Sequence, residues 1–453
     1  AGVRGGAAAR ILRRAEHRYK KEEKTKDKEG RKNNSEMSGL MRCKYSCIAV
    51  VGAALALFCA AALASMGAEL RSATDHPTQR MCGVTHGFTG GVKEKLRYSC
   101  DLPAPVRRTD QLLISVHAVG MNPVDFKLRR ARLPIWLAAY AGRKITGADV
   151  AGIVLEAPRG SAFARGDRVA ALLPIVFTRW GAAAEVVAVR AAHAAKIPDN
   201  ISFIDAASIP LVALTVVQGL ERGGVVANSA QHQKIVIHAG AGGVGTFALQ
   251  WVRAVLGMSE VVASCSPSST ALVTSLGATR ALDYHDGNNT ALWSLRNFDV
   301  VLDPMSHRYE ARTLARSTVN SSAPGVLRPG GTYLGIMSSD WALDAAGDEV
   351  VGDGASFRRA FVSWLRCALG SASAVRHRIV AVQPDGETLA RVFERVADGS
   401  VRAVIHAVLP LRDAAKAHAL LEKGSTHGKI VLRVVGGDDA PRATAIGGEV
   451  VYS

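Results

Sequence analysis

The stretch KIVIHAGAGGVGTFALQWV, residues 234–252, decides the fold of this chain. It opens with a short run of apolar and β-branched residues, typical of a strand buried in a parallel sheet. A cluster of glycines follows, and after it the apolar residues recur at helical spacing. The stretch therefore predicts a strand, a tight glycine turn and a helix, in that order.

Three glycines of this cluster have the spacing G-x-G-x-x-G, namely Gly240, Gly242 and Gly245. Between a strand and a helix, that spacing is typical of a dinucleotide-binding turn. The first glycine allows the tight turn, the second lets the backbone approach a pyrophosphate, and the third lets the helix pack on the strand. The unpaired N–H groups of the helix start then face the phosphates. A purely structural turn needs fewer glycines, so the sequence predicts a bound dinucleotide.

The segments around this turn predict the rest of the fold. After it, the runs EVVASCS, STALVTSLGA and FDVVLDP continue the alternation of strand and helix, which indicates a parallel sheet with right-handed crossovers. Before residue 209, LLISVHAV and AAEVVAV are β-like runs separated by turn residues, without βα alternation. We therefore predict an α/β chain with a Rossmann doubly wound parallel sheet and a second, mostly antiparallel domain.

The second strand of the predicted sheet indicates which dinucleotide binds. An NAD site has Asp or Glu about 20 residues beyond the motif, where it bonds the ribose hydroxyls. Here Cys265 occupies that place, and the next acid along the chain is Asp283. The hydroxyls of Ser264 and Ser266 leave room for a 2′-phosphate and can donate to it. The sequence favours NADPH, although no Lys or Arg stands beside these serines.

Composition and charge exclude some classes of function. The chain has 453 residues, 48% of them apolar and 21% charged, which is typical of a globular protein with two or three domains. Its net charge is +17, but residues 1–44 alone hold 14 Lys and Arg against 6 Asp and Glu. The rest of the chain has no obvious basic stripe. We therefore do not expect the folded part to bind nucleic acid.

The cysteines are scattered and odd in number. They contain no CxxC pair and no Cys/His cluster, so we expect neither a disulfide framework nor a structural zinc site. Most of them are expected to be reduced and simply packed. The seven are Cys43, Cys47, Cys59, Cys82, Cys100, Cys265 and Cys367.

The front of the chain contains an apolar segment. Residues 1–44 are highly charged and predicted to be disordered, whereas residues 45–68 carry no charge and are long enough to cross a ~30 Å hydrocarbon core. Three interpretations stay open: a membrane anchor with its basic flank on the negative side, a cleaved signal peptide that starts at Met37 or Met41, and an organelle-targeting leader that begins with the Arg-rich run ARILRRAEHR.

Ordered motifs between residues 96 and 435 give the chain a family resemblance. They are VGMNPVDFKLR, GADVAGIV, GDRVAALLP, DAASIPLVALTVVQGL, HAGAGGVGTFALQ, LGATRALDYHD, FDVVLD, RPGGTYLGI and HGKIVLRVV. In this order they resemble the zinc-independent quinone oxidoreductase branch of the medium-chain dehydrogenases/reductases. The closing segment and the leader are most similar to the reticulon-4-interacting-protein group of mitochondrial oxidoreductases. The resemblance implies a GroES-like catalytic domain, a mitochondrial membrane location, with secretory-pathway insertion left open, and a homodimer as a family expectation.

The resemblance and the changes in composition divide the chain into seven segments. We predict a basic tail over 1–44, a transmembrane or signal segment (the N-terminal hydrophobic helix) over 45–68, a linker over 69–95, the GroES-like catalytic domain over 96–209, the NADP-binding Rossmann domain over 210–370, a return to the catalytic domain over 371–435, and a C-terminal tail over 436–453.

Residue chemistry argues against a catalytic metal. Catalytic zinc needs three Cys, His or carboxylate ligands and one open position. Zinc-dependent members of the resembled family place a cysteine in the segment that reads Asn122-Pro123 here, and a His-Glu pair where this chain reads Ala148-Asp149. We therefore expect no metal.

The resemblance also implies positions for the cofactor contacts. It places the phosphate contacts at Gly242, Gly243 and Val244, the 2′-phosphate at Ser264 and Ser266, the adenosine at Tyr284, the far side of the cofactor at His427 and Lys429, and the nicotinamide near Asn122, the candidate catalytic residue. Each polar residue has an alternative role. Tyr284 can cover the sheet edge, His427 can be a solvated loop histidine, and Asn122 before Pro123 can form an Asx-turn. Asp125 and Asp149 are expected to hold loops rather than to exchange protons.

These features together favour hydride transfer from NADPH to a small molecule, either a quinone or an α,β-unsaturated carbonyl. A different interpretation is a membrane-tethered scaffold or respiratory-complex assembly protein that keeps the fold with little or no catalysis. Pro304 and Met305 favour that alternative, since they stand where the family usually continues toward a glycine. A zinc-type alcohol dehydrogenase is a third interpretation, and it requires a metal.

Overall fold

The computed structural model describes residues 75–87, 96–130, 144–174, 180–225, 232–285, 290–305, 313, 325–336, 375–424, 426–434, 443–446 and 449–452. The chain divides into two compact units, residues 1–68 and 69–453, and all the described residues belong to the second. None of the helices within the described ranges combines the length and apolar character needed to cross a membrane. The tail over 1–44 and the apolar segment over 45–68 lie outside those ranges, so both stay predictions.

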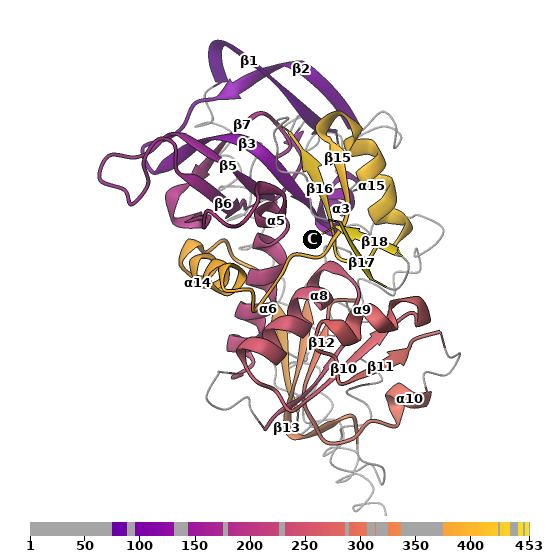
Figure 1. Cartoon of the computed structure of the whole chain (residues 1–453). Helices are drawn as coiled ribbons and strands as arrows, with labels where there is room; N and C mark the ends of the chain where they lie inside the picture. Colours follow the sequence, from indigo (N-terminus) through magenta and orange to yellow (C-terminus); the bar gives the residue numbers. More distant parts are fainter. Residues whose placement is uncertain are drawn as a thin grey trace, which may run out of the picture. The chain divides into compact units, whose positions relative to one another are not determined.

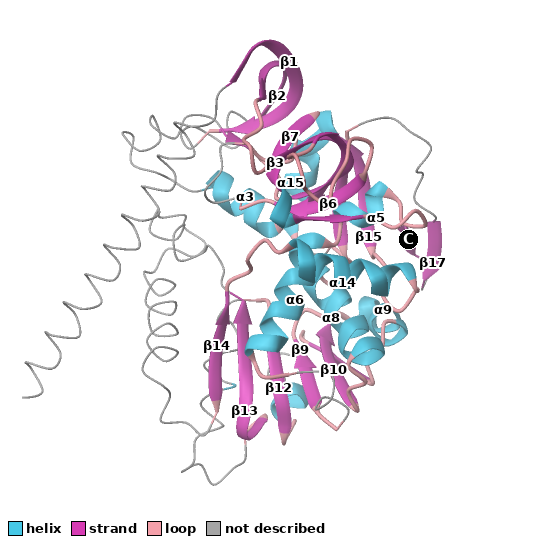
Figure 2. Cartoon of the chain, turned by 90° about the vertical axis from the view of Figure 1, so that its left-hand side faces the viewer, coloured by secondary structure: helices cyan, strands magenta, loops and turns pink. Residues whose placement is uncertain are grey.

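The predicted Rossmann sheet is present, with six strands in the order β11-β10-β9-β12-β13-β14. All neighbouring strands run parallel (Figures 1 and 2). This is the strand order of dinucleotide-binding doubly wound folds, in which ligands bind beyond the carboxyl ends of the strands. The strands are β9 Lys234–Ile237, β10 Glu260–Cys265, β11 Arg280–Asp283, β12 Phe298–Asp303, β13 Leu327–Ile336 and β14 Arg376–Val380.

Helices pack on this sheet as the sequence periodicity predicts. The centre of β9 is buried on both sides, since Ile235, Val236 and Ile237 have no exposed surface, and Figure 2 shows α6 and α8 packed together beside the sheet. Pro210 begins α6, where its missing N–H costs nothing. The helices are α6 Pro210–Arg222, α8 Gly243–Gln250 with a π-helical continuation Trp251–Val255, α9 Thr270–Ser275 after a 3-10 turn Pro267–Ser269, and α10 Thr290–Trp293.

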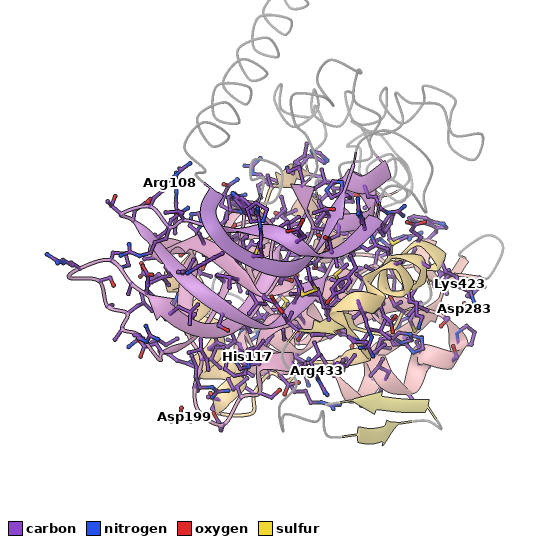
Figure 3. All side chains as sticks on the ribbon, turned by 90° about the horizontal axis from the view of Figure 1, so that it is seen from above. Arg108, His117, Asp199, Asp283, Lys423 and Arg433 are labelled. Atoms are coloured by element: carbon purple, nitrogen blue, oxygen red, sulfur yellow. A yellow bond between two sulfur atoms is a disulfide. The ribbon has the colours of Figure 1, made fainter. Side chains whose placement is uncertain are left out.

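A nine-stranded sheet forms the second domain, and it is antiparallel except for the β15–β16 pair. The last part of the chain contributes β16 to this sheet, where it pairs with β3. Figure 3 shows His117 of β3 beside Arg433 of β16, and the Val434 N–H donates to the His117 carbonyl at 2.9 Å. The strands are β3 Gln111–Met121, β5 Asp149–Glu156, β6 Arg168–Leu172, β7 Val186–Arg190, β8 Ala194–Lys196, β15 Ile405–Pro410, β16 Lys429–Arg433, β17 Ala443–Ile446 and β18 Glu449–Tyr452.

The remaining elements flank that sheet. A three-stranded sheet has the order β2-β1-β4. Its strands are β1 Asp75–His86, β2 Leu96–Pro105 and β4 Lys144–Ile145. The helices are α3 Pro123–Arg130, α5 Phe203–Ala207, α14 Gly386–Ala397 and α15 Ala414–Lys423, with 3-10 turns at Ala191–His193 and Leu411–Asp413.

Four strands, β1, β14, β17 and β18, lie where the sequence predicted none. β1 lies in the predicted linker. Its buried residues Met81 and Val84 stand among polar residues, so the sequence pattern did not indicate a strand. β14 belongs to the parallel sheet, so the Rossmann sheet extends past residue 370 to Val380. The hairpin of β17 and β18 lies in the predicted C-terminal tail. The domain limits otherwise stay predictions.

One pair of cysteines forms a disulfide that the sequence did not indicate. Cys82 and Cys100 form a disulfide between β1 and β2, and Gly83 lies opposite Ser99 in this antiparallel pair. Because the two strands were not predicted to pair, a spacing of 18 residues gave no sign of the bond. Cys265 is a buried free thiol, as expected. The other four cysteines lie outside the described residues.

Candidate functional site

The glycine turn ends β9 and begins α8. Gly242 precedes the first turn of α8 with an extended backbone, φ −75° and ψ 173°. Its N–H donates to the Ala239 carbonyl at 3.0 Å, and its carbonyl accepts the N–H of Thr246 at 2.8 Å. The first N–H groups of any helix lack partners inside the helix. Those of Gly243, Val244 and Gly245 therefore point out from the start of α8, where a phosphate can accept them.

The three glycines of the motif differ in the space that the fold leaves for a side chain. A Cβ at Gly245 would lie 2.3 Å from the Ala239 carbonyl oxygen, and one at Gly240 would lie 2.8 Å from the Ala263 Cβ. Packing alone therefore excludes a side chain at both positions. A Cβ at Gly242 would meet only the Ala239 oxygen, at 3.3 Å, among the described atoms. Packing therefore leaves more room for a side chain at Gly242 than at Gly240 or Gly245.

The segment that enters β16 runs along this turn. The Gly428 N–H donates to the Ala241 carbonyl at 2.8 Å, and Gly428 forms an isolated parallel bridge with Gly242. Gly428 has φ +74°, and a Cβ there would lie 2.1 Å from the Val404 oxygen, so glycine is required. The neighbours of Gly428, His427 and Lys429, are thus held beside the glycine turn, although they are far from it in sequence.

The serines at the end of β10 have two different roles. Ser264 is buried, and its hydroxyl accepts the Ala239 N–H at 3.2 Å and lies 3.3 Å from the His238 Nδ1. Ser264 therefore stabilises the start of the glycine turn through its hydrogen bond to Ala239. The half-buried Ser266 Oγ instead lies 2.8 Å from the Ser269 Oγ and 3.1 Å from the Ser268 Oγ.

His427 joins the serines, because the Ser269 Oγ lies 3.0 Å from its Nε2. The sequence did not single out Ser268 and Ser269, although the run SPSS directly after a strand was a signal for them. Tyr284 follows β11 at the same edge of the sheet. It is 37% exposed, its ring centroid lies 4.1 Å from that of His285, and its N–H donates to the Cys265 carbonyl at 3.3 Å. Both roles predicted for Tyr284 stay predictions.

Four polar side chains form a buried cluster where β3, β5 and β16 meet. Asn122, Asp125 and Asp149 are at most 1% exposed, and Lys429 is 5% exposed. The Lys429 ammonium donates to the Met121 carbonyl at 2.9 Å, to the Asn122 Oδ1 and to the Asp149 Oδ2 at 3.2 Å. We call Asn122, Asp125, Asp149 and Lys429 the buried quartet.

The amide of Asn122 is engaged inside the quartet. Its Nδ2 donates to the Asp149 Oδ2 at 2.8 Å, and its Oδ1 accepts from Lys429. Its backbone N–H donates to the Asp125 Oδ2 at 2.7 Å. At the turn into α3 it is thus the Asp125 side chain that bonds the backbone, whereas the Asn122 side chain is bonded to Gly120, Asp149 and Lys429. The catalytic role of Asn122 stays a prediction.

The quartet connects the antiparallel sheet to the Rossmann domain. The Leu211 N–H, in the first turn of α6, donates to the Asp149 Oδ1 at 2.8 Å, and a carboxylate is stabilised at a helix N-terminus. On the other side, a Cβ at Gly243 would lie 3.0 Å from the Lys429 Cδ. Lys429 therefore packs on the start of α8 while its ammonium binds Asn122 and Asp149. The predicted positions of Asn122, Gly243 and Lys429 come together here.

Burial dominates the electrostatics of the two carboxyls. It raises the pKa of the Asp125 carboxyl to about 7, and the nearby Asp149 adds to the rise while the Asn122 N–H and Lys429 oppose it. Burial also raises the pKa of Asp149, and Lys429, Asn122 and the Leu211 N–H offset part of that rise. Among the described residues the Asp125 Oδ1 has no hydrogen-bond partner, whereas the Oδ2 accepts the Asn122 N–H, so a proton would sit on Oδ1.

The raised pKa of Asp125 makes stability depend on pH. The folded chain keeps a proton that the unfolded chain releases near the ordinary pKa of 3.8, so this carboxyl costs stability increasingly as pH rises from about 4 to about 7, by up to ~1.4 kcal/mol per pH unit. Because Asp125→Asn cannot ionise, we expect its stability relative to the wild type to increase as the pH rises through this window. Urea unfolding midpoints of both proteins at several pH values measure the gap, and a gap that does not change with pH would contradict the expectation.

Pro304 and Met305, where this chain differs from the resembled family, directly follow a buried carboxylate. Asp303 is fully buried; its Oδ1 accepts the Met305 N–H at 2.8 Å and its Oδ2 accepts the Tyr333 hydroxyl at 2.6 Å. The turn after β12 is thus fixed to the sheet from within, and the Met305 side chain is 41% exposed.

Comparison with known proteins agrees with this geometry. Residues 108–199 match the family described as "Alcohol dehydrogenase GroES-like domain", and residues 276–432 match the one described as "Zinc-binding dehydrogenase". The first match lies on the antiparallel sheet, and the second runs from the end of α9 through β11 to β16. In the part of the chain that the structure describes, no three His, Cys, Asp or Glu side chains gather as a metal site requires.

Individual relatives are oxidoreductases by name. The mitochondrial NAD(P)H oxidoreductase RTN4IP1 of Danio rerio is 28% identical over 362 residues, which cover 76% of this chain and 89% of that protein. The 2-methylene-furan-3-one reductase of Solanum lycopersicum is 32% identical over 226 residues, which cover 49% of this chain and 56% of the reductase.

Two solved structures share the fold at 25% identity. The quinone oxidoreductase from Coxiella burnetii aligns with a TM-score of 0.63, covering 79% of this chain and all of that one. A mycobacterial protein complexed with NADPH aligns with a TM-score of 0.59, covering 78% of this chain and all of that one.

Proposed function

This chain belongs to the medium-chain dehydrogenases/reductases, and from that premise we propose that it is a zinc-independent enzyme that uses NADPH to reduce a quinone or an α,β-unsaturated carbonyl. As an NAD(P)H oxidoreductase it needs a dinucleotide site, and the glycine turn is our candidate. The observation that carries the proposal is the room beside Gly242, at the start of a helix whose first N–H groups point toward it.

The preference for NADPH rests on the end of β10. Residues 264–270 contain no carboxylate that could bond ribose hydroxyls. Asp283, opposite Cys265 on β11, is bonded to His285, and the hydroxyls of Ser266 and Ser268 stand at the end of β10. One similar structure is complexed with NADPH. Gly243 and Val244 would hold the pyrophosphate, and Tyr284 would lie beside the adenosine.

The cofactor, when bound, supplies the hydride. The protein orients the nicotinamide against the acceptor and excludes water. Without a metal, negative charge that develops on the acceptor oxygen must be met by hydrogen-bond donors. Quinones and α,β-unsaturated carbonyls are activated enough to react under such conditions, whereas simple alcohols are not. The names of a quinone oxidoreductase and a furanone reductase among the similar proteins support this acceptor class.

Zinc independence rests on the buried quartet. At the positions where zinc-dependent members of the family carry ligands, this chain has the amide of Asn122 and the carboxylate of Asp149, both bonded to the Lys429 ammonium. A cation bound to that carboxylate would have to displace the ammonium. Elemental analysis of the purified protein tests the proposal, and stoichiometric zinc that turnover requires would refute it.

We expect the purified protein to bind NADPH at least about tenfold more tightly than NADH, the difference that one or two hydrogen bonds to a charged phosphate provide. Titration of each cofactor by fluorescence or calorimetry gives the two Kd values. Oxidation of NADPH upon addition of a panel of quinones and enones then tests for turnover. Cofactor binding without turnover of any acceptor would favour the scaffold interpretation instead.

We also propose a cellular location for the protein. The mitochondrial names of relatives support a mitochondrial location, which imaging of the tagged full chain would test. The homodimer and the membrane segment over 45–68 remain predictions.

A further inference from the structure

An ion pair with little exposure to solvent joins α3 to α15. The Arg129 Nη2, near the end of α3, pairs with the Glu422 Oε1, near the end of α15. The Arg129 side chain is 1% exposed and the Glu422 side chain 15% exposed, so water screens their attraction only weakly. α15 packs on α3 and on β16 (Figure 1). The pair therefore fixes the ends of the two helices against each other.

A neutral imidazole accompanies the pair. His418 lies one turn before Glu422 on α15 and is 1% exposed. Burial above all, and then the nearby Arg129 and His86, lower the pKa of His418 to about 3. The imidazole is consequently uncharged at neutral pH and does not compete with Arg129 for the carboxylate. The attraction between Arg129 and Glu422 is thus maintained at neutral pH.

Both helices connect directly to the candidate site. α3 begins immediately after Asn122, a member of the buried quartet. α15 ends one residue after Glu422, and the chain then passes through residues 426–428 to β16. At the end of that segment, the Gly428 N–H donates to the Ala241 carbonyl of the glycine turn at 2.8 Å. The ion pair therefore fixes the point from which the chain returns to the glycine turn.

We propose that Arg129 and Glu422 are positioning residues for the coenzyme, because by fixing α15 to α3 they hold residues 426–428 against the glycine turn before the dinucleotide binds. Neither side chain touches the ligand. Without the pair, the segment would have to become ordered upon binding, and that ordering costs affinity. Since the segment bonds the turn at Ala241 through backbone atoms, the effect does not depend on the 2′-phosphate. The inference rests on the proposed function and extends it to two residues outside the site.

The test compares the Kd values of NADPH and NADH for the full chain and for Glu422→Gln, which has a similar shape but no charge. At a temperature where both proteins are folded, the two Kd values are expected to rise by the same factor, roughly three- to tenfold. Glu422→Asp keeps the charge but is one methylene shorter. It is expected to show a smaller rise, again shared by both cofactors, and it serves as the second variant if Glu422→Gln folds poorly.

The matched control is Asp299→Asn. Asp299 is 13% exposed, and it accepts the Arg328 Nε at 2.5 Å and the Lys234 N–H at 2.7 Å. It lies at the amino ends of β9 and β12, whereas the glycine turn follows the carboxyl end of β9. We expect Asp299→Asn to lower the urea unfolding midpoint, as Glu422→Gln does, and to leave both Kd values unchanged. The control thereby separates positioning from stability.

Three results would decide against the inference or against the function beneath it. If the Kd values of Glu422→Gln equal those of the wild type, or rise only as much as those of Asp299→Asn, the ion pair acts on stability alone and the inference is overturned. A loss of affinity for NADPH but not for NADH would also overturn it, because the effect would then pass through the 2′-phosphate. A wild-type protein that binds neither cofactor would instead refute the proposed function.

Discussion

Replacing Gly242 by valine is expected to raise the Kd for NADPH at least 100-fold, a loss of about 3 kcal/mol, while most of the stability of the fold remains. The described atoms near a Cβ at this position are limited to the Ala239 oxygen, at 3.3 Å, so the fold can accept the side chain with a small shift. The branched side chain would then fill the space that the pyrophosphate needs, and it would keep the phosphates away from the first N–H groups of α8.

The control is another glycine of the same motif. A Cβ at Gly245 would lie 2.3 Å from the Ala239 oxygen and 2.6 Å from the Gly240 Cα, so Gly245→Ala must push the turn and the helix apart. We expect Gly245→Ala to lower the urea unfolding midpoint far more than Gly242→Val does. If Gly242→Val binds NADPH as the wild type does, the phosphates are bound somewhere other than this turn.

The second large effect is expected in the buried quartet. Lys429→Met keeps the length and apolar stem that pack on Gly243 but removes the ammonium from Asp149 and Asn122. An ionised Asp149 would then be buried without its cation, close to Asp125. Removal of one partner of a buried ion pair costs about 3–5 kcal/mol, and urea unfolding of the variant should show a loss of that size.

A double variant separates this charge effect from lost packing. If Asp149 is destabilising only because its cation is gone, then Lys429→Met combined with Asp149→Asn should recover part of the stability that Lys429→Met loses. If the stability losses of Lys429→Met and Asp149→Asn simply add in the double variant, the ammonium and the carboxylate do not act as a pair. That result would also remove the argument that Lys429 occupies the place of a metal cation.

The parts of this site that follow from local sequence were predictable. The strand, glycine turn and helix over residues 234–252 were predicted because apolar spacing and glycine positions constrain the backbone locally. The same is true of the parallel sheet, because the alternation of strand and helix along the chain indicates right-handed crossovers between parallel strands. The resemblance then indicated that His427 and Lys429 return to the cofactor, and the structure places both beside the turn.

Contacts between distant segments were not predictable in the same way. The pair Ser269–His427 is separated by 158 residues, and no spacing rule joins a serine after one strand to a histidine before another. The disulfide Cys82–Cys100 depends on the pairing of two strands, the first of which looked like a linker. The bonds from the Asn122 amide to Lys429 and Asp149 were not predictable either, because burial of a lysine requires acceptors that only the folded chain provides.

A crystal structure of the protein with NADPH tests the central claim most directly, since it locates the phosphates. We predict that the pyrophosphate oxygens lie about 3 Å from the backbone nitrogens of Gly243 and Val244 and that the cofactor fills the space beside Gly242. Density for the cofactor at a different place, or protein side chains that occupy the space beside Gly242, would contradict the account.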